Sequence, residues 1–210
     1  MEPFTRTEGI AAPLLRDNID TDAVIPVPWM KSVQPDFARA LFANWRWRNG
    51  DGVTEVAGFV LNREPFRAAK ILVAGANFGC GSSREHAVWA LLGFGIRCIL
   101  APSFGDIFYE NAFKNGLLPL PLPREAMDRI AGALERREGG CRMAVDLEAR
   151  RIEFGGAQSL EFTIDEGRRT ALLAGLDEIG MTLRDAEAMA AFQQRDREDR
   201  PWIYEPALNE

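Results

Sequence analysis

The sequence predicts an α/β fold whose central sheet is at least partly parallel. An apolar run at 70–76 is typical of a buried strand, residues 84–94 favour a helix, and residues 96–101 are again apolar. A strand, a helix and a strand in this order form a βαβ unit, whose two strands are parallel. Short alternating runs with turns between them then predict an antiparallel meander. These runs lie at 142–147, 150–155 and 159–164.

The segments that precede the βαβ unit are shorter and less regular. We expect a strand at residues 9–12 and a turn at 17–22, where Asp, Asn and Thr side chains can hydrogen-bond to their own backbone. Three prolines indicate an irregular loop at 26–36, and apolar side chains at helical spacing predict a short helix at 37–47. Residues 53–69 are expected to be extended or irregular.

Helices and strands continue to alternate after the βαβ unit. The pattern predicts a helix at 103–115, a strand at 117–120 and an amphipathic helix at 123–138. Two further helices are expected at 166–174 and 182–194.

The length of 210 residues fits one domain with a helical appendix. We place the main domain at residues 1–194 and a charged and aromatic tail at 195–210. Residues 195–200 carry charges of both signs and are expected to be solvated, and Trp202 and Tyr204 follow with no local core.

The composition argues against several classes of function. A net charge of −6 disfavours nucleic acid and anionic membranes as partners. The chain has neither the pattern of a signal peptide nor a window that approaches the ~20 apolar residues of a membrane span. We therefore expect a cytoplasmic protein.

The three cysteines, Cys80, Cys98 and Cys141, are far apart in the sequence. They form neither a disulfide framework nor the close pairs that a zinc site or an iron–sulfur cluster needs. We expect this chain to bind no metal or cofactor of its own. Because His86 is the only histidine, proton transfer would use other side chains or a partner chain.

The most informative segment is the glycine-rich loop from Asn77 to His86, which joins a predicted strand to a predicted helix. The first N–H groups of a helix are unpaired and, with the helix dipole, attract anions. Arg84 adds a guanidinium that binds a carboxylate or phosphate through two parallel hydrogen bonds. The loop is therefore predicted to bind a small anion.

Three common motifs do not fit this loop. A phosphate-binding P-loop needs a lysine after its last glycine, and none follows Gly81. A dinucleotide-binding loop would have glycine in place of Arg84. A serine hydrolase needs Gly-x-Ser-x-Gly and a histidine from a distant segment, whereas His86 lies four residues after Ser82.

Five segments of the chain resemble the motifs of one protein family. One is Phe-Gly-Cys-Gly-Ser-Ser-Arg-Glu-His at 78–86. The other four are Asn18–Pro26, Ala101–Tyr109, Asp146–Glu148 and Gly175–Leu183. In this order and spacing, across roughly residues 5–192, they resemble the aconitase swivel domain in the form used by 3-isopropylmalate dehydratase small subunits.

The resemblance implies a three-layer β/β/α swivelling-domain fold and a heteromeric hydro-lyase. The implied reaction isomerises 2-isopropylmalate to 3-isopropylmalate in leucine biosynthesis, by loss of water and its re-addition at the neighbouring carbon. The implied partners are a small dicarboxylate substrate and a large subunit that carries a [4Fe–4S] cluster. This chain alone would be inactive.

The resemblance also assigns chemistry to the loop. Ser82 would be the general base, acting as an alkoxide that Arg84 and the helix N-terminus stabilise. Alternatively, Ser82 only caps the helix, since Glu85 three residues later would complete a capping box. Arg84 would bind a substrate carboxylate, or alternatively lie on the helix surface.

The remaining site residues form two groups. Those implied to bind the substrate are Ser83, Asp22 and Thr21, and those implied to support the site without touching the substrate are Asp20, Glu85 and His86. His86 could pair with Asp106 or Asp22. Turn chemistry alone also explains the two aspartates, because the later acidic ligands of a calcium loop are missing.

The chain departs from the family pattern between residues 27 and 39. The arginine of an Arg-Thr-Gly turn that reaches the substrate in relatives is missing, and Lys31 or Arg39 could replace it. The apolar residues of the segment are Trp29, Met30 and Val33. They suit an alkyl substituent on the substrate; alternatively, Trp29 and Met30 pack against the core.

Two other functions are compatible with these residues. A paralogous hydro-lyase would act on another 2-hydroxy diacid, such as an alkylmalate, a citraconate-type acid or homoaconitate. A non-catalytic module would use the loop only to bind an anion.

Overall fold

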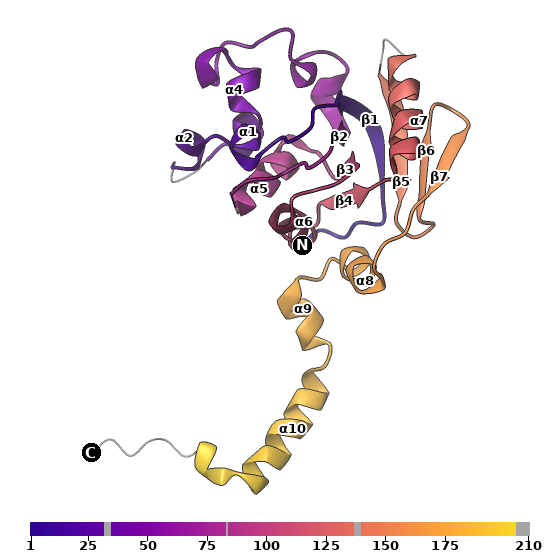
Figure 1. Ribbon diagram of the computed structural model, residues 1–210. Coiled ribbons are helices and arrows are strands. Elements are labelled where there is room, and N and C mark those ends of the chain that lie inside the picture. The colour runs from indigo at the N-terminus through magenta and orange to yellow at the C-terminus, as the bar shows by residue number, and fades with distance from the viewer. Residues whose placement is uncertain (32–34, 83, 137–139, 205–210) are drawn as a thin grey trace. The chain divides into compact units, whose positions relative to one another are not determined.

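A mixed sheet forms the centre of the protein. The computed structural model describes residues 1–31, 35–82, 84–136 and 140–204, and in this part of the chain seven strands are ordered β4-β3-β2-β1-β5-β6-β7 (Figure 1). The strands are β1 (Arg6–Leu14), β2 (Ala69–Ala74), β3 (Cys98–Ala101), β4 (Leu118–Pro121), β5 (Cys141–Asp146), β6 (Arg151–Phe154) and β7 (Gln158–Glu161). Strands β1 to β4 are parallel, whereas β5 pairs antiparallel with β1 and begins the meander. The predicted partly parallel sheet is confirmed.

Both faces of the parallel strands are buried. On β2, Leu72 and Ala74 belong to one apolar cluster and Ile71 and Val73 to another. Successive strand residues point to opposite faces, so each cluster lies on one side of the sheet. Continuous apolar strands of this kind occur where both faces are covered.

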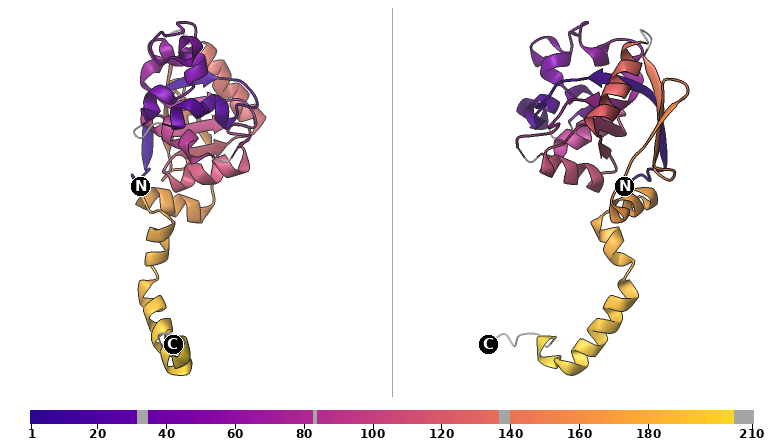
Figure 2. Two further views of the ribbon diagram at one scale, coloured as in Figure 1. Left: turned by 90° about the vertical axis from the view of Figure 1, so that its left-hand side faces the viewer. Right: turned by 45° about the vertical axis from the view of Figure 1, so that its right-hand side comes forward.

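Helices cover the two faces. One face packs against α5 (Glu85–Phe94), α6 (Asp106–Lys114) and the short helices α1 (Thr21–Val24) and α3 (Phe37–Ala40). The other face packs against α7 (Arg124–Glu135) and α8 (Glu166–Ala174). The β6–β7 hairpin lies beside α7 (Figure 2). The sheet is thus the middle of a layered structure.

Two main-chain bonds join the chain's start to α8. The Phe4 N–H donates to the Leu172 carbonyl at 2.8 Å, and the Met1 amino group donates to the Gly175 carbonyl at 3.0 Å. They close the compact unit Met1–Gly175.

The segment between β1 and β2 is more helical than predicted. Part of the expected irregular loop forms α2 (Val27–Met30), and the helix expected at 37–47 is two short helices, α3 and α4 (Ala43–Arg46). The helix breaks because Phe42 has a left-handed φ of 50°, while its side chain is fully buried. Two 3-10 turns, Val60–Asn62 and Phe66–Ala68, lie in the stretch expected to be extended or irregular.

A buried arginine holds this irregular segment together. Arg46 is 6% exposed and donates from Nη1 to the Ala38 carbonyl at 2.7 Å and from Nε to Asn62 Oδ1 at 3.2 Å. Asn62 in turn donates to the Arg46 carbonyl at 2.7 Å. Burial lowers the pKa of Arg46 to about 10. The guanidinium replaces the regular backbone bonding that this segment lacks.

We expect Arg46→Ala to lower the free energy of unfolding by about 2–4 kcal/mol, because it leaves buried oxygens without donors. Chemical denaturation of the two proteins measures the difference. Arg48→Ala, which removes an exposed arginine nearby, should change stability by less than about 0.5 kcal/mol. Equal stability of the Arg46 variant and the wild type would contradict this role.

The elements after β2 lie within a few residues of their predicted positions. This agreement covers α5, β3, α6, β4, the meander and α8. The predicted helix at 123–138 is α7, and its last two predicted residues fall outside the described ranges.

A second unit begins at Leu176 and is helical. It contains α9 (Glu178–Leu183), which was not predicted, and α10 (Ala186–Asp199), which corresponds to the helix predicted at 182–194. A 3-10 turn at Pro201–Ile203 follows. The charged run 195–200 is exposed as expected except at Asp196, but it is largely helical. The predicted boundary between residues 194 and 195 falls inside α10 and stays a prediction. No helix in the described ranges is both long and apolar enough to cross a membrane.

Candidate anion-binding site

Three loops meet at one edge of the sheet, where β1, β2 and β3 end. Because these strands are parallel, their carboxyl ends share this edge, which is where open α/β sheets bind ligands. The Gly79 N–H donates to the Ile19 carbonyl at 2.7 Å, and the Thr21 N–H donates to the Cys80 carbonyl at 3.0 Å. The loop after β2 is thereby fixed to the loop after β1.

The loop after β3 holds the glycine-rich loop from its other side. The Phe78 N–H donates to the Ser103 carbonyl at 3.1 Å, and the Gly105 N–H donates to the Phe78 carbonyl at 2.9 Å. A Cβ atom on Gly105 would lie only 2.6 Å from the Gly79 carbonyl oxygen. The two backbones therefore approach more closely than any other residue would allow.

Gly79 is constrained both by its backbone and by its surroundings. Its φ is +75°, and a Cβ atom there would overlap the ring of Phe108. Gly81 has a similar φ of +87°, but the nearest atom to its Cβ position, Asp20 Cβ, is 3.4 Å away. The two glycines share the backbone constraint and differ in crowding.

This pair separates backbone strain from packing. Gly81→Ala should lower the free energy of unfolding by about 1–2 kcal/mol, the cost of a left-handed φ for alanine. Gly79→Ala should cost roughly 1–3 kcal/mol more, because it also overpacks the Phe108 contact. Denaturant melts of both variants test the difference. The loop packing described here would be wrong if the two variants were equally stable.

Helix α5 begins just after the loop, at Glu85, and Arg84 is its N-cap residue. Ser82 stands two residues before the cap, and among the described residues no side chain makes the capping bond. The capping-box explanation of Ser82 is therefore wrong, because the helix starts later than that motif requires. Ser82 is exposed, and Ser83 lies outside the described residues.

Arg84 forms an ion pair with Asp22 across the two loops, between Nη1 and Oδ1. The Arg84 side chain is 20% exposed and that of Asp22 is 56% exposed. An anion that binds Arg84 would compete with a solvent-facing carboxylate. Two of the residues that were predicted to contact the substrate thus lie together.

Thr21 and Asp20 act on the backbone in this structure. Thr21 is 1% exposed, and its hydroxyl donates to the Ser82 carbonyl at 2.8 Å. Asp20 caps α1 by accepting from the Ala23 N–H at 2.7 Å. The turn expected at 17–22 therefore leads into a short helix whose first residue holds the Ser82 peptide.

Glu85 is held by a residue that the sequence did not point to. Its Oε1 accepts from Asn115 Nδ2 at 2.8 Å, and Asn115 Oδ1 accepts from Trp89 Nε1 at 2.8 Å. Asn115 directly follows α6, and the sequence predicted it only as the last residue of the helix at 103–115. It draws the Glu85 carboxylate toward α6.

His86 contacts aromatic rings. Its ring centre lies 4.7 Å from that of Trp89 and 6.2 Å from that of Phe37. Within the described ranges it forms no ion pair with Asp106 or Asp22, so the expected pairing is absent. His86 instead packs on the aromatic side of α5.

An open depression of about 530 Å³ lies beside Arg84. It is lined by Met30, Arg84, Glu85, His86, Trp89 and Asn111. Met30 therefore brings an apolar side chain from α2 to the guanidinium. The depression combines the Arg84 guanidinium with the Glu85 carboxylate, the Asn111 amide and the side chains of Met30, His86 and Trp89.

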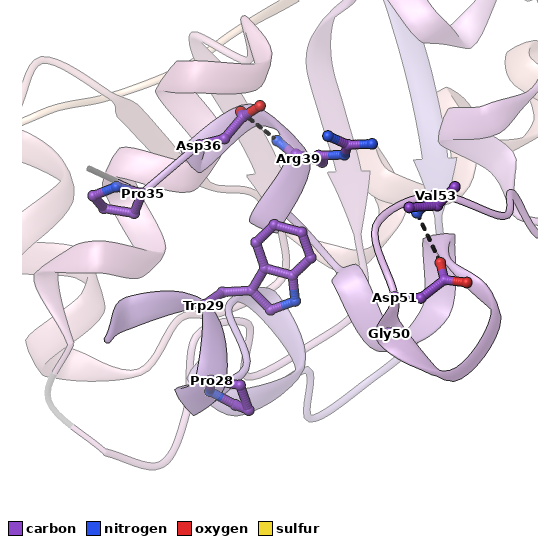
Figure 3. A pocket seen from close by; sticks show the side chains of 8 residues that line it. All are labelled: Pro28, Trp29, Pro35, Asp36, Arg39, Gly50, Asp51 and Val53. Carbon is purple, nitrogen blue, oxygen red and sulfur yellow. Dashed lines mark hydrogen bonds between the residues drawn. The ribbon is translucent and has the colours of Figure 1, made fainter. Parts of the chain in front are cut away.

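A second pocket, of about 490 Å³, lies in the region of residues 27–39, the segment that differs from the family pattern (Figure 3). Trp29 and Arg39 line it, and Arg39 Nε donates to the Gly52 carbonyl. Arg39 thus lines this second pocket and not the depression beside Arg84. Trp29 and Met30 both also pack against the core cluster, and Val33 lies outside the described residues.

Known proteins resemble the chain over nearly its whole length. The family model described as the aconitase C-terminal domain matches residues 1–125, and the model for the C-terminal domain of the 3-isopropylmalate dehydratase small subunit matches residues 178–204. The 3-isopropylmalate dehydratase small subunit of Ruegeria pomeroyi is 48% identical over 97% of this chain and 100% of its own length. The chain belongs to the family of 3-isopropylmalate dehydratase small subunits.

Further relatives agree with this assignment. The small subunit of Rhodospirillum centenum is 46% identical over 96% of this chain and 98% of its own length. The crystal structure of a 3-isopropylmalate dehydratase from Methanocaldococcus jannaschii has a TM-score of 0.62 and 26% identity, covering 90% of this chain and 99% of that one. The predicted family and the aconitase-type swivelling fold are confirmed.

The cysteines of this family member lie on separate elements. Cys80 is in the glycine-rich loop, Cys98 is on β3 and Cys141 is on β5. Burial raises the pKa of the Cys98 thiol far above its ordinary value, which disfavours a thiolate ligand. Within the described ranges, no three His, Cys, Asp or Glu side chains are grouped so as to hold a metal ion. These residues do not fit an iron–sulfur cluster.

Proposed function

We propose that this chain, with a large subunit, isomerises 2-isopropylmalate to 3-isopropylmalate in the leucine pathway of the cytoplasm. The observation that carries the proposal is the 48% identity to a curated small subunit over 97% of the chain. The geometry supports it, because the Arg84 cation, the exposed Ser82 and the N-terminus of α5 meet at one edge of the sheet.

Arg84 would bind one carboxylate of the substrate. A guanidinium forms two parallel, charge-assisted hydrogen bonds with a carboxylate, and these fix the orientation of the bound acid. Asp22 would release Arg84 at this step, since its carboxylate is the more exposed partner of the pair. Asp22 would then line the site, as the family resemblance implies.

Ser82 would remove the C–H proton next to the bound carboxylate. A serine hydroxyl acts as a base only as the alkoxide, which Arg84 and the unpaired N–H groups of α5 would stabilise. Thr21 would hold the Ser82 peptide in place through its 2.8 Å bond. The large subunit would carry the [4Fe–4S] cluster, which supplies a Lewis acid for the departing hydroxyl.

Ser82→Ala should lower kcat of the reconstituted enzyme by at least ~10³-fold, through loss of the base. Steady-state kinetics with the cognate large subunit measure it. Ser159→Ala, an exposed serine on β7, serves as the control and should be normal. Near-normal turnover of the Ser82 variant with retained ligand affinity would show that Ser82 is not the base.

Thr21→Val should lower kcat by about tenfold with little change in KM, because an unanchored Ser82 spends less time in the reactive position. Thr21→Ser keeps the hydroxyl and should restore most of the activity. Kinetics of the three proteins give the split between kcat and KM. A loss in the serine variant with near-normal activity of the valine variant would show that Thr21 contributes packing only.

The depression beside Arg84 should favour alkyl-substituted malates over tricarboxylic acids. Met30 places an apolar side chain there, while Arg39 lines the other pocket. We expect kcat/KM for isopropylmalate and methylmalate to exceed that for citrate and homocitrate. Preference for citrate or homocitrate by more than about tenfold would indicate a paralogous hydro-lyase instead.

A further inference from the structure

The unit that begins at Leu176 has almost no core of its own. Asp196 is its only buried side chain among residues 176–204. Its exposed apolar side chains are Ile179, Leu183, Met189, Phe192, Trp202 and Ile203. Ile179 is 70% exposed, Trp202 is 66% exposed and Phe192 is 56% exposed. Helices are stabilised mainly by packing an apolar face, so these side chains need a partner surface.

A polar clasp fixes the end of this unit. The Tyr204 hydroxyl donates to Asp196 Oδ2 at 2.7 Å, and Arg200 Nε donates to Asp196 Oδ1 at 2.6 Å. The Tyr204 bond and then Arg200 lower the pKa of Asp196, and the Asp196 bond raises the pKa of Tyr204. The clasp folds residues 201–204 back on α10, so Trp202 and Ile203 are held in place while they stay exposed.

The charges of residues 176–204 favour a partner other than a second copy of this chain. Seven acidic and four basic residues lie between Leu176 and Tyr204. Two copies of this unit face to face would bring like charges together, which opposes pairing. A different chain with an apolar groove and a basic rim is complementary to it. The segment is long enough to supply the roughly 20–30 residues that one partner contributes to a standard interface.

We propose that residues 176–204 dock into an apolar, basic-rimmed groove on the large subunit. The proposal rests on the proposed function, which requires that subunit. The family model for the C-terminal domain of small subunits matches residues 178–204, so this segment is shared by members of the family. Phe192 and Trp202 are the expected anchors, because large aromatic side chains contribute most to such interfaces.

The test titrates purified large subunit into the full-length chain, with binding measured by calorimetry and activity measured in parallel. The variants are Phe192→Ala, Trp202→Ala and, as a second helical position, Met189→Ala; Gln193→Ala is the matched control on the same helix. We expect the Kd to rise at least tenfold for each aromatic variant and less than twofold for the control. The kcat at saturating large subunit should be unchanged, because the anchors lie outside the catalytic loops.

Three results would overturn the proposal. The first is a change of less than twofold in Kd for both aromatic variants that retain wild-type helicity by circular dichroism. The second is a stable dimer of the chain alone that Phe192→Ala dissociates in light scattering, since the surface would then bind a second copy. The third is an equal loss of affinity for the control. A wild-type complex that forms without isomerase activity would refute the proposed function and leave the docking result standing.

Discussion

The site depends on backbone hydrogen bonds that join three loops at one edge of the sheet. Parallel strands bring these loops together, and the bonds from Gly79 and Gly105 fix the middle loop on both sides. Side-chain chemistry is added to a frame that is already rigid. Because Gly105 and Gly79 approach so closely, a larger residue at either position would separate the loops and misplace Arg84 and Ser82 together.

In the proposed function, the ion pair between Arg84 and Asp22 would give the free chain an internal substitute for a substrate carboxylate. It keeps the guanidinium oriented while no substrate is bound, which reduces the ordering cost of binding. Exposure of Asp22 makes the pair easy to exchange, since exposed ion pairs contribute little stability. Under these two proposals the chain would hold a preformed anion site, and the exposed apolar side chains of its C-terminal segment would be covered by a partner.

The sequence predicted the regular part of the fold, while the roles assigned to the site residues stay predictions. The βαβ unit and the meander follow from periodicity, and the family motifs brought Asp22, Ser82 and Arg84 to attention. Periodicity failed where tertiary contacts decide the backbone, as at Phe42, whose left-handed φ splits a predicted helix. The roles of Thr21 and Asn115 were also out of reach, because each depends on a hydrogen-bond partner distant in the sequence.

The most direct test of the account is a structure of the reconstituted enzyme with 3-isopropylmalate bound. We expect a substrate carboxylate within hydrogen-bond distance of the Arg84 guanidinium, with the Asp22 pair broken and Ser82 Oγ facing the carbon that loses its proton. A bound substrate that leaves the Arg84–Asp22 pair intact and contacts neither Arg84 nor Ser82 would contradict it.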